Sequence, residues 1–429
     1  MGGSQAILQA CHPKSIRRGE PQDDGSLFST TSGKAGRMKT KTIDVSGKVV
    51  QASDNGGTLD YEYYSSDKTK SVASGGVVLT QMEYDDYNRQ TKLFDVNAGW
   101  TEYDYNAYGQ LVQEKNALNH IRTYTYDNYG PVSTESGPEG NTGYDYVTSG
   151  NGINQVKKVT APNNFSTEFE YDGFGRPLKI KETIGAEVLE TKYEYNSKGE
   201  NIAIIYPSGH KIEYEYINGV MSKVKDANST IFSNAVIDKF GNYTSYTLGN
   251  GLVGSNVYNN YGMLQKTKVG NIFELDFVFD PVTGNLNSRK DVNKNLLETF
   301  NYDDLNRLTE MTFNGSTKTI GYAANGNKTS ETEIGLSDYN TVQLHQQTNI
   351  APFGNLVRTA PLQTINYTKF DRTLDITEGD YKLTLDYGPA KNRKKTVLEY
   401  QNNVVKTRYF PVTMKKRSML TAIPKRCII

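Results

Sequence analysis

The sequence contains few cysteines and no excess charge of either sign. Cys11 and Cys427, the two cysteines among 429 residues, lie near opposite ends of the chain, so they predict neither a disulfide framework nor a cysteine-ligated metal site. Lysine plus arginine equals aspartate plus glutamate at 48 each, and no long run of one sign occurs. Because no net field would attract a polyanion, we do not expect nucleic acid as a partner.

Long apolar segments are also missing. The mean hydropathy is −0.64, and no stretch approaches the roughly 18 apolar residues that suggest a membrane span. Residues 1–20 contain no continuous apolar core of the kind found in secretion signals. We therefore expect neither a membrane span nor a signal peptide within this sequence.

Tyrosine, by contrast, is abundant. The chain has 31 Tyr and 15 Phe against 1 Trp and 13 Pro, and it has 39 Gly. Tyrosine and phenylalanine pack well on the pleated surface of a sheet, and glycine supplies tight turns. The composition therefore favours strands over helices.

One phrase recurs at intervals of about 21 residues. An aromatic residue precedes Asp or Asn and stands four residues before Gly or Asn, as in Tyr171-Asp172-Gly173-Phe174-Gly175. The positions of the leading residue are Tyr84, Tyr105, Tyr126, Tyr146, Tyr171, Tyr195, Tyr216, Ile237, Tyr258, Phe279, Tyr302 and Tyr322. Self-similarity at such a period is the signature of a repeat architecture.

The repeat reads as a β-hairpin. In residues 211–216, "KIEYEY", apolar and charged residues alternate, which indicates a half-buried strand. Aspartate then accepts hydrogen bonds from turn amides, and Gly or Asn tolerates the left-handed conformation of a four- or five-residue loop. On the return strand, we expect Leu178 and Ile180 to face one side and Lys179 and Lys181 the other, paired with residues 168–171.

The repeat residues to which we assign a structural role are Tyr105, Gly109, Tyr126, Asp127, Gly130, Tyr171, Asp172, Gly175, Arg176, Tyr258, Gly262, Tyr302, Asp303, Asn306 and Arg307. An isolated hairpin is marginally stable in water. Hairpins placed side by side would form a long antiparallel sheet whose apolar face must be covered, either by curling or by a second sheet. The predicted fold class is therefore all-β, with tandem hairpins in one array.

The pattern resembles the RHS-repeat, or YD-repeat, family of bacterial Rhs and wall-associated polymorphic toxins, the insecticidal toxin-complex C component and the animal teneurins. The segments 171–176 and 302–308 are close matches to the family's Y-D-x-x-G-R-L, and the match extends over about residues 36–409. The resemblance implies a strip of hairpins that curls into a spiral shell, a partial β-cocoon, and encloses or presents a C-terminal toxin or other effector domain. It also implies a secreted or cell-surface parent protein.

The family's closing D-P-x-G-L segment is not found near the end of this sequence, so we carry over neither self-cleavage nor toxin activity. We divide the chain into residues 1–35, non-repetitive and disordered or artefactual; 36–336, the repeat array; 337–410, degenerate repeats that continue it; and 411–429. The last segment alternates nowhere, and another reading frame restores the phrase Ala-Asn-Gly-Asn of residues 324–327, so we attribute it to a frameshift.

Cofactor and metal motifs fit turns better than sites. Residues 249–254 match G-x-G-x-x-G, but a strand pattern follows where a dinucleotide loop needs a helix, so we expect a hairpin turn and no cofactor. Asp291, Asn293 and Asn295 have the spacing of calcium ligands, but Leu296 replaces the required glycine, so we favour a solvated turn and no metal. The dispersed histidines are His12, His120, His210 and His345.

Catalysis is not expected. The acidic pairs at 85–86 and 303–304 share one position of the repeat, where the turn role of aspartate suffices, and no nucleophile motif is present. Tyr108, Phe174 and Tyr261 could stack on sugar rings, but we favour packing of these rings within the array. With the shell that the resemblance implies, we expect a non-enzymatic shell fragment; the alternative is an adhesin that binds cell-surface glycans. An array with uncapped edges is expected to aggregate in isolation.

Overall fold

The computed structural model describes residues 17–18, 26–34, 37–227, 229–354, 362–411 and 416–419. Its side chains are described within 39–227, 229–354 and 362–411. Cys11, His12 and Cys427 lie outside these residues, as does most of the segment 411–429 that we attribute to a frameshift. The four-segment division of the chain stays a prediction.

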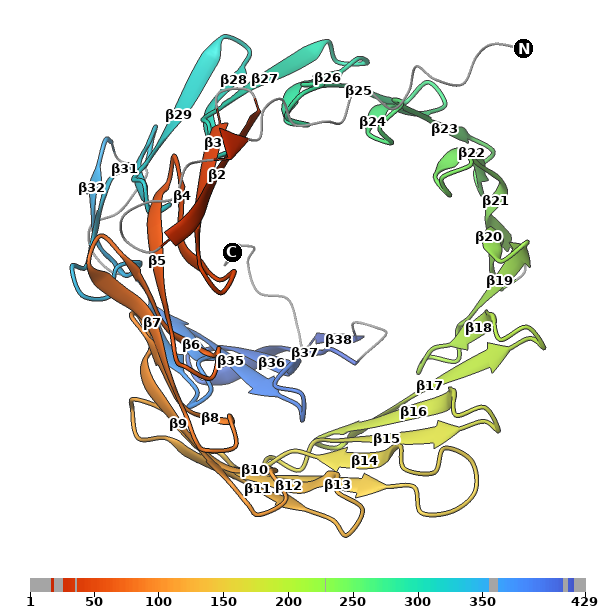
Figure 1. Cartoon of the computed structure of the whole chain (residues 1–429). Coiled ribbons are helices and arrows are strands. Elements are labelled where there is room, and N and C mark those ends of the chain that lie inside the picture. Colours follow the sequence, from red (N-terminus) through yellow and green to blue (C-terminus); the bar gives the residue numbers. More distant parts are fainter. Residues whose placement is uncertain are drawn as a thin grey trace, which may run out of the picture. The chain divides into compact units, whose positions relative to one another are not determined.

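The chain forms two compact units, each built from two stretches of sequence. Unit 1 comprises residues 1–103 and 255–359, and unit 2 comprises residues 104–254 and 360–429. The described residues contain strands and turns, and no helix among them is long and apolar enough to cross a bilayer. Figure 1 labels the strands in chain order.

Unit 1 holds β1–β8, β24–β32 and the larger parts of β9 and β23. Their bounds are β1 Arg17–Arg18, β2 Ser26–Lys34, β3 Arg37–Asp44, β4 Val49–Asp54, β5 Gly57–Tyr63, β6 Thr69–Ser74, β7 Val77–Tyr84, β8 Gln90–Asp95, β9 Gly99–Tyr105, β23 Val253–Tyr258, β24 Leu264–Val269, β25 Phe273–Phe279, β26 Leu286–Asp291, β27 Leu296–Tyr302, β28 Leu308–Phe313, β29 Ser316–Tyr322, β30 Lys328–Glu331, β31 Gly335–Tyr339 and β32 Gln347–Pro352.

Unit 2 holds β10–β22 and β33–β38. Their bounds are β10 Leu111–Lys115, β11 Ile121–Tyr126, β12 Val132–Gly137, β13 Gly140–Tyr146, β14 Val156–Thr160, β15 Ser166–Tyr171, β16 Pro177–Ile184, β17 Glu187–Tyr195, β18 Asn201–Ile205, β19 Lys211–Ile217, β20 Val220–Asp226, β21 Ser229–Ile237, β22 Tyr243–Leu248, β33 Thr364–Tyr367, β34 Thr373–Glu378, β35 Tyr381–Tyr387, β36 Arg393–Tyr400, β37 Asn403–Tyr409 and β38 Lys416–Met419.

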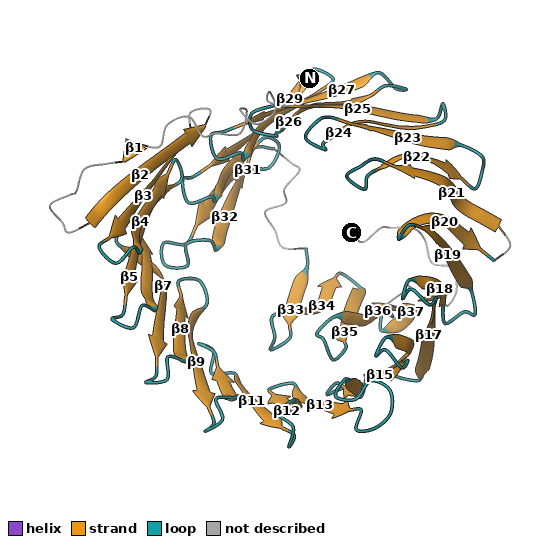
Figure 2. Cartoon of the chain, turned by 45° about the vertical axis from the view of Figure 1, so that its right-hand side comes forward, coloured by secondary structure: helices purple, strands orange, loops and turns teal. Residues whose placement is uncertain are grey.

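Within each unit, consecutive strands pair antiparallel. In unit 1 this holds from β2 to β8 and from β24 to β32, and in unit 2 from β10 to β22 and again from β33 to β38. Short turns separate the strands (Figure 2). The predicted all-β fold of tandem antiparallel hairpins is confirmed.

The β15–β16 hairpin shows how the alternation of residues becomes a register. Phe169 pairs with Ile180, and Glu168 and Glu170 pair with Lys181 and Lys179, as the alternation predicts. Lys181 and Lys179 also form ion pairs with these two glutamates. One face of the hairpin is therefore apolar and the other is matched in charge.

Leu178 does not share the face of Ile180, and this part of the prediction is wrong. Tyr171 pairs with Pro177 while Glu170 pairs with Lys179, so Leu178 is an extra residue in the return strand. Its side chain is 40% exposed, whereas Ile180 is 9% exposed. An extra residue of this kind is a β-bulge, which bends the strand and re-aims its side chains.

The bulge belongs to the repeat. The same register shift lies directly before Tyr63, Tyr84, Tyr126, Tyr146, Tyr171, Tyr195, Tyr216, Phe279, Tyr302, Tyr322, Tyr339, Tyr367 and Tyr387. Because bulges increase local twist, each hairpin receives the same deformation at the same place.

In unit 2, a second sheet covers part of the array. The strands β33–β38 form a separate sheet (Figure 2), and Tyr409 of β37 packs against the buried residues Phe165, Ile184 and Leu189. Ile184 is 2% exposed. The second sheet thus packs on the array and covers its apolar face around β14–β17. Covering by a second sheet is one of the two ways, the other being curling, in which we expected this face to be buried.

Candidate functional site

The repeat turn is the feature that recurs most often along the chain. Asp172 N donates to Arg176 O at 2.9 Å and Gly175 N donates to Asp172 O at 3.0 Å, which closes a five-residue loop. The Asp172 carboxylate accepts bonds from the amides of Phe174 and Arg176, each at 2.9 Å, and from Arg176 Nε at 2.7 Å. Both oxygens of this carboxylate therefore accept hydrogen bonds from its own turn.

These hydrogen bonds determine the ionisation of the turn aspartates. Partial desolvation would raise the pKa of Asp172, but bonds from the Arg176 side chain and from the backbone amides of Arg176 and Phe174 outweigh it, so the pKa is lowered. Asp303 and Asp85 have lowered pKa values through the same balance, with Arg307 and Arg89 as partners. These carboxylates therefore stay ionised and accept the hydrogen bonds that hold their own turns.

The fourth position of the turn requires a left-handed backbone. Gly175 has φ of 77°, and Asn306 occupies the same position with φ of 64°. Glycine and asparagine adopt this region at low cost. Other predicted turn residues there are Gly109, Gly130 and Gly262, with φ of 80°, 100° and 78°.

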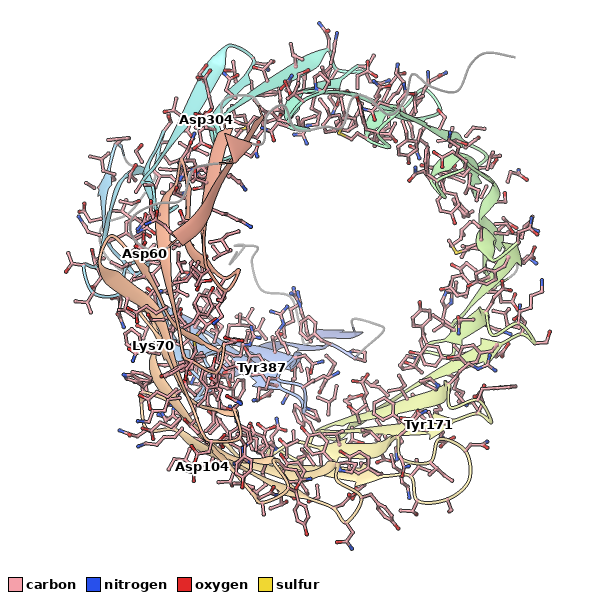
Figure 3. All side chains as sticks on the ribbon, viewed as in Figure 1. Asp60, Lys70, Asp104, Tyr171, Asp304 and Tyr387 are labelled. Atoms are coloured by element: carbon pink, nitrogen blue, oxygen red, sulfur yellow. The ribbon has the colours of Figure 1, made fainter. Side chains whose placement is uncertain are left out.

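The repeat tyrosines end their strands and reach back to the preceding hairpin. Tyr171 and Tyr387, both labelled in Figure 3, donate their hydroxyls to Val156 O at 2.6 Å and Thr373 O at 2.7 Å. The acceptor is in each case the first residue of the strand that precedes the tyrosine's own strand. Equivalent bonds are made by Tyr63, Tyr126, Tyr146, Tyr195, Tyr216, Tyr302 and Tyr339.

This fastening was not anticipated from the sequence, although the preference for tyrosine over phenylalanine is its signal. Only the hydroxyl distinguishes the two side chains, and here it is the donor that joins one hairpin to the next. The acceptor follows the bulge, where the ladder is interrupted and a carbonyl needs a new partner. Tyr105 and Tyr258 are likewise the last residues of β9 and β23.

In two of the turns, an arginine contacts the following repeat. The Arg176 guanidinium lies 4.4 Å from the ring centroid of Tyr195, and that of Arg307 lies 4.8 Å from Tyr322. Arg307 Nη1 also donates to Ala323 O at 2.8 Å. Cation–π contacts of this kind contribute roughly 0.5–1 kcal/mol at exposed sites, so the arginine couples its own turn to the following hairpin.

The structure does not gather the predicted repeat residues into one pocket. Each set, such as Tyr126, Asp127 and Gly130 or Tyr302, Asp303 and Asn306, lies at the end of its own strand and in the turn that follows. Asp127 Oδ1 accepts from Tyr129 N at 2.8 Å. The recurring site is therefore a joint between neighbouring hairpins.

A polar cluster lies where the second sheet of unit 2 meets the array. Arg122 pairs with Glu135 at 2.9 Å and with Glu114 at 3.3 Å, and Lys391 pairs with Glu135 at 3.2 Å. Tyr124 donates to Glu114 at 3.2 Å, and its burial, the largest influence, raises its pKa to about 12. Each charged side chain of the cluster is paired with one of opposite charge, so we interpret the cluster as a structural network.

Unit 2 contains hollows beside the second sheet and over the array. A cavity of about 300 Å³ lies between the turns of β12–β14 and the second sheet, lined by Pro138, Pro162, Phe370 and Tyr387 among others. A wider groove of about 1010 Å³ runs over β13–β16. Its Glu168 is paired with Lys158 at 3.1 Å and Lys181 at 3.4 Å, and its Glu170 forms an ion pair with Lys179.

The two motifs that resemble a dinucleotide loop and a calcium loop lie in turns between strands. Residues 249–252 connect β22 to β23 with Gly251 N donating to Leu248 O at 2.9 Å, so the predicted hairpin turn is confirmed. Asp291 Oδ1 accepts from Lys294 N at 3.0 Å, and Asn295 has φ of 52°. Within the described part of the chain, no group of three His, Cys, Asp or Glu side chains could hold a metal ion.

His210, His345 and Asp304 have partners nearby, whereas the buried Nδ1 of His120 has no hydrogen-bond partner among the described residues. His210 Nε2 lies 2.9 Å from Asp226 Oδ1, and the backbone of His345 donates to Asn97 Oδ1 at 3.1 Å. Asp304, beside Asp303, accepts from Asn55 at 3.0 Å. His120 N donates to Asn116 Oδ1 at 2.9 Å in the turn after β10.

Tyr108, Phe174 and Tyr261 lie at the tips of their turns. Their side chains are 90%, 86% and 67% exposed, so the expectation that they pack within the array is wrong for this chain. The third residue of the turn points away from the sheet because the Asp or Asn side chain occupies the inside of the loop.

The chain matches no protein-family model and no curated protein. It is similar to solved structures of TcdB2-TccC3-Cdc42 and of TcdB2-TccC3 without hypervariable C-terminal region, in both cases with 13% identity, a TM-score of 0.77 and coverage of 91% of this chain. The Tc holotoxin pore of Photorhabdus luminescens, with a TccC3 mutation, matches at 13% identity and a TM-score of 0.68 over 89% of this chain.

The chain spans about a quarter of the length of these structures, 26%, 26% and 24%. At such identity the likeness shows the fold, and the RHS/YD-repeat fold recognised from the sequence is confirmed. The turn, bulge and tyrosine fastening are the local means by which this sequence reaches that fold.

Proposed function

We propose that this chain, which has the RHS/YD-repeat fold, is a non-enzymatic structural protein that forms part of a wall around a C-terminal toxin or effector, or presents that effector. The observation that carries the proposal is the agreement in fold over 91% of the chain with TcdB2-TccC3, a protein described as having a hypervariable C-terminal region. A wall built from one repeated hairpin keeps the same geometry, so it can enclose C-terminal domains that differ in sequence.

The use of side chains within the array supports a wall. Asp172 and Arg176 serve their own turn, Arg176 also contacts Tyr195, and Tyr171 fastens its hairpin to the strand before it. The residues most often repeated thus hold neighbouring hairpins together. The parent protein is proposed to be secreted or displayed at the cell surface, where such a container would deliver its content.

The test is expression of the locus from the codon of Met1 through the region beyond Ile429, with and without the single-base change near the codon of Val404 that restores the frame. In the frame-restored product we expect the array to protect the downstream part from protease, and deletion of residues 36–410 to speed its cleavage at least tenfold. Equal cleavage rates with and without the array would reject enclosure.

A second function, binding of cell-surface glycans by an adhesin-like array, is favoured by one observation. Tyr108, Phe174 and Tyr261 present exposed rings, and aromatic faces stack on sugars. Binding on a glycan array that disappears in Tyr108→Ala and Tyr261→Ala variants, with unchanged circular dichroism, is the result expected of this function. Uniform absence of glycan binding by the folded chain would remove it.

A further inference from the structure

The turns of each unit lie along two edges of its sheet. The YD edge consists of the turns that follow the repeat position, such as 172–176 and 303–307. The opposite edge consists of the turns that join one hairpin to the next, such as 54–57 and 137–140. In Figure 2 these turns appear in teal at the strand ends.

In unit 1, YD turns of the later stretch meet opposite-edge turns of the earlier stretch. Asn55 Nδ2 donates to Asp304 Oδ2 at 3.0 Å. A Cβ added to Gly56 would lie 3.1 Å from Leu305 Cδ1, so the tip of the YD turn rests directly on this glycine. Asp304 is labelled in Figure 3.

A second contact of the same kind follows further along unit 1. Gln343 Nε2 donates to Asn97 O at 3.2 Å, and the amide of His345 donates to Asn97 Oδ1 at 3.1 Å. Asn97 lies in the opposite-edge turn between β8 and β9, and the donors lie in the YD turn between β31 and β32.

Unit 2 repeats the arrangement. The amide of Lys369, in the YD turn after β33, donates to the Glu139 carboxylate in the opposite-edge turn between β12 and β13. Asn163 Nδ2, in the turn between β14 and β15, donates to Tyr387 O at 3.0 Å where the next YD turn begins. All four contacts therefore join a YD edge to an opposite edge, with the YD turn in the later stretch.

The tips of the YD turns differ in exposure. Leu305 and Phe370, the tips of two turns that meet an opposite edge, are half-buried, whereas Val342, the tip of a third such turn, is 72% exposed. Six other YD turns have an aromatic tip that is 65–90% exposed; the tips are Tyr87 and Tyr261 in unit 1 and Tyr108, Tyr129, Phe174 and Phe240 in unit 2. Isolated exposed aromatics are ordinary, but their recurrence at one repeat position of unit 2 marks the YD edge of that unit as an interaction surface.

We propose that this exposed YD edge binds the opposite edge of a second copy of the chain. The second copy carries the polar, glycine- and asparagine-rich turns that the chain already places against its own YD turns in both units. The contact is heterologous, because the two edges differ, so association continues from copy to copy instead of closing as a dimer. A burial of about 150–250 Å² for each large aromatic supplies the apolar part of the contact.

The test uses the full chain, whose mass distribution is followed by sedimentation velocity over a hundredfold range of concentration. We expect concentration-dependent association that a Tyr108→Ser, Tyr129→Ser, Phe174→Ser variant weakens at least tenfold. The matched control replaces Val188 and Val236, each 54% exposed on a strand, by serine and should associate like the parent. A monomer at every concentration, or equal weakening in variant and control, would overturn the proposal.

A second measurement does not depend on folding of the triple variant. A photo-crosslinking amino acid in place of Tyr108 should join two copies, with the links mapped to opposite-edge turns such as 185–186 and 206–210. Links to strand faces would contradict the edge contact. If instead the folded chain stays monomeric and the triple variant loses binding to a glycan array, the exposed tips serve sugars and not a second copy.

Discussion

Lys394 and Glu182 form an ion pair in which both side chains are almost fully buried, with 4% and 2% of their surfaces exposed. The pair joins β36 of the second sheet in unit 2 to β16 of the array. Each charge depends on the other, because removing one partner leaves an uncompensated charge in a dry environment. The pair is therefore a buried contact between the second sheet and the array in which neither charge can be removed alone without cost.

We predict that Lys394→Met lowers the free energy of unfolding of unit 2 by about 3–5 kcal/mol, the usual cost of orphaning a buried charge. The double variant Lys394→Met, Glu182→Leu should recover most of this loss because no charge remains buried. The measurement is urea denaturation followed by circular dichroism. Lys395→Met, which breaks a more exposed pair with Asp386 at 3.6 Å, is the control and should cost no more than about 1 kcal/mol.

The tyrosine fastening predicts a difference between two tyrosines of one turn. Tyr126→Phe removes the bond to Leu111 O, which measures 2.6 Å, and should lower the free energy of unfolding by about 0.5–1.5 kcal/mol. Tyr129→Phe should have no measurable effect because the Tyr129 side chain is 83% exposed. Equal effects of the two substitutions on the urea midpoint would show that the hydroxyl bond contributes nothing.

The left-handed turn position predicts a graded effect of substitution. Gly262 has φ of 78°, and a Cβ placed on it would meet nothing within 4 Å, so backbone conformation alone decides the outcome. Gly262→Ala should lower the free energy of unfolding by roughly 1–2 kcal/mol. Gly262→Asn should cost less, since Asn306 occupies the equivalent position with φ of 64°. Thermal denaturation of the two variants measures the order, and alanine tolerated as well as asparagine would contradict it.

The lowered pKa values of the turn aspartates predict acid lability. Asp85, Asp172 and Asp303 titrate below their ordinary value of 3.8 in the folded chain, so the folded state binds fewer protons than the unfolded state in this range. Their contribution is present above pH 3.8 and is lost as the pH falls through the folded pKa. The urea concentration at the midpoint of unfolding should therefore decrease as the pH is lowered from 5 to 2.

Replacing all three aspartates by asparagine should flatten this decline. Asparagine keeps the turn bonds, as Asn106 Oδ1 does with the amides of Tyr108 and Gln110, both at 3.0 Å. Asp304→Asn is the control because Asp304 accepts from Asn55 and not from the turn amides. A triple variant with the same pH dependence as the parent would assign the acid lability to other groups.

The sequence predicts the hairpins because side-chain alternation and turn chemistry are local. Phe169 opposite Ile180 follows from alternation alone, and the left-handed Gly175 follows from the residue types in the turn. The bulge at Leu178 does not, because an extra residue in a strand depends on backbone bonding that hydrophobicity does not encode. Apolar character placed Leu178 on the wrong face for this reason.

Partners that are distant or purely backbone leave no readable trace in the sequence. The acceptor of the Tyr171 hydroxyl is the carbonyl of Val156, and a carbonyl looks the same at every residue. Glu182 and Lys394 are 212 positions apart, and nothing in either local pattern relates them. The exposure of Tyr108 likewise depends on which turns meet, which is a property of the folded units.

The hydroxyls of the fastening tyrosines bond to the strand directly before their own, so a repeat brings both its fastening and the carbonyl that the following repeat will use. Duplicating a hairpin in the gene would supply a matching neighbour without any new side-chain chemistry, and deleting one would leave the flanking repeats compatible. A single-residue insertion inside a strand would instead turn its later side chains to the other face. Evolution of such an array is therefore expected to change its length in whole modules, with the bulge and the tyrosine inherited together.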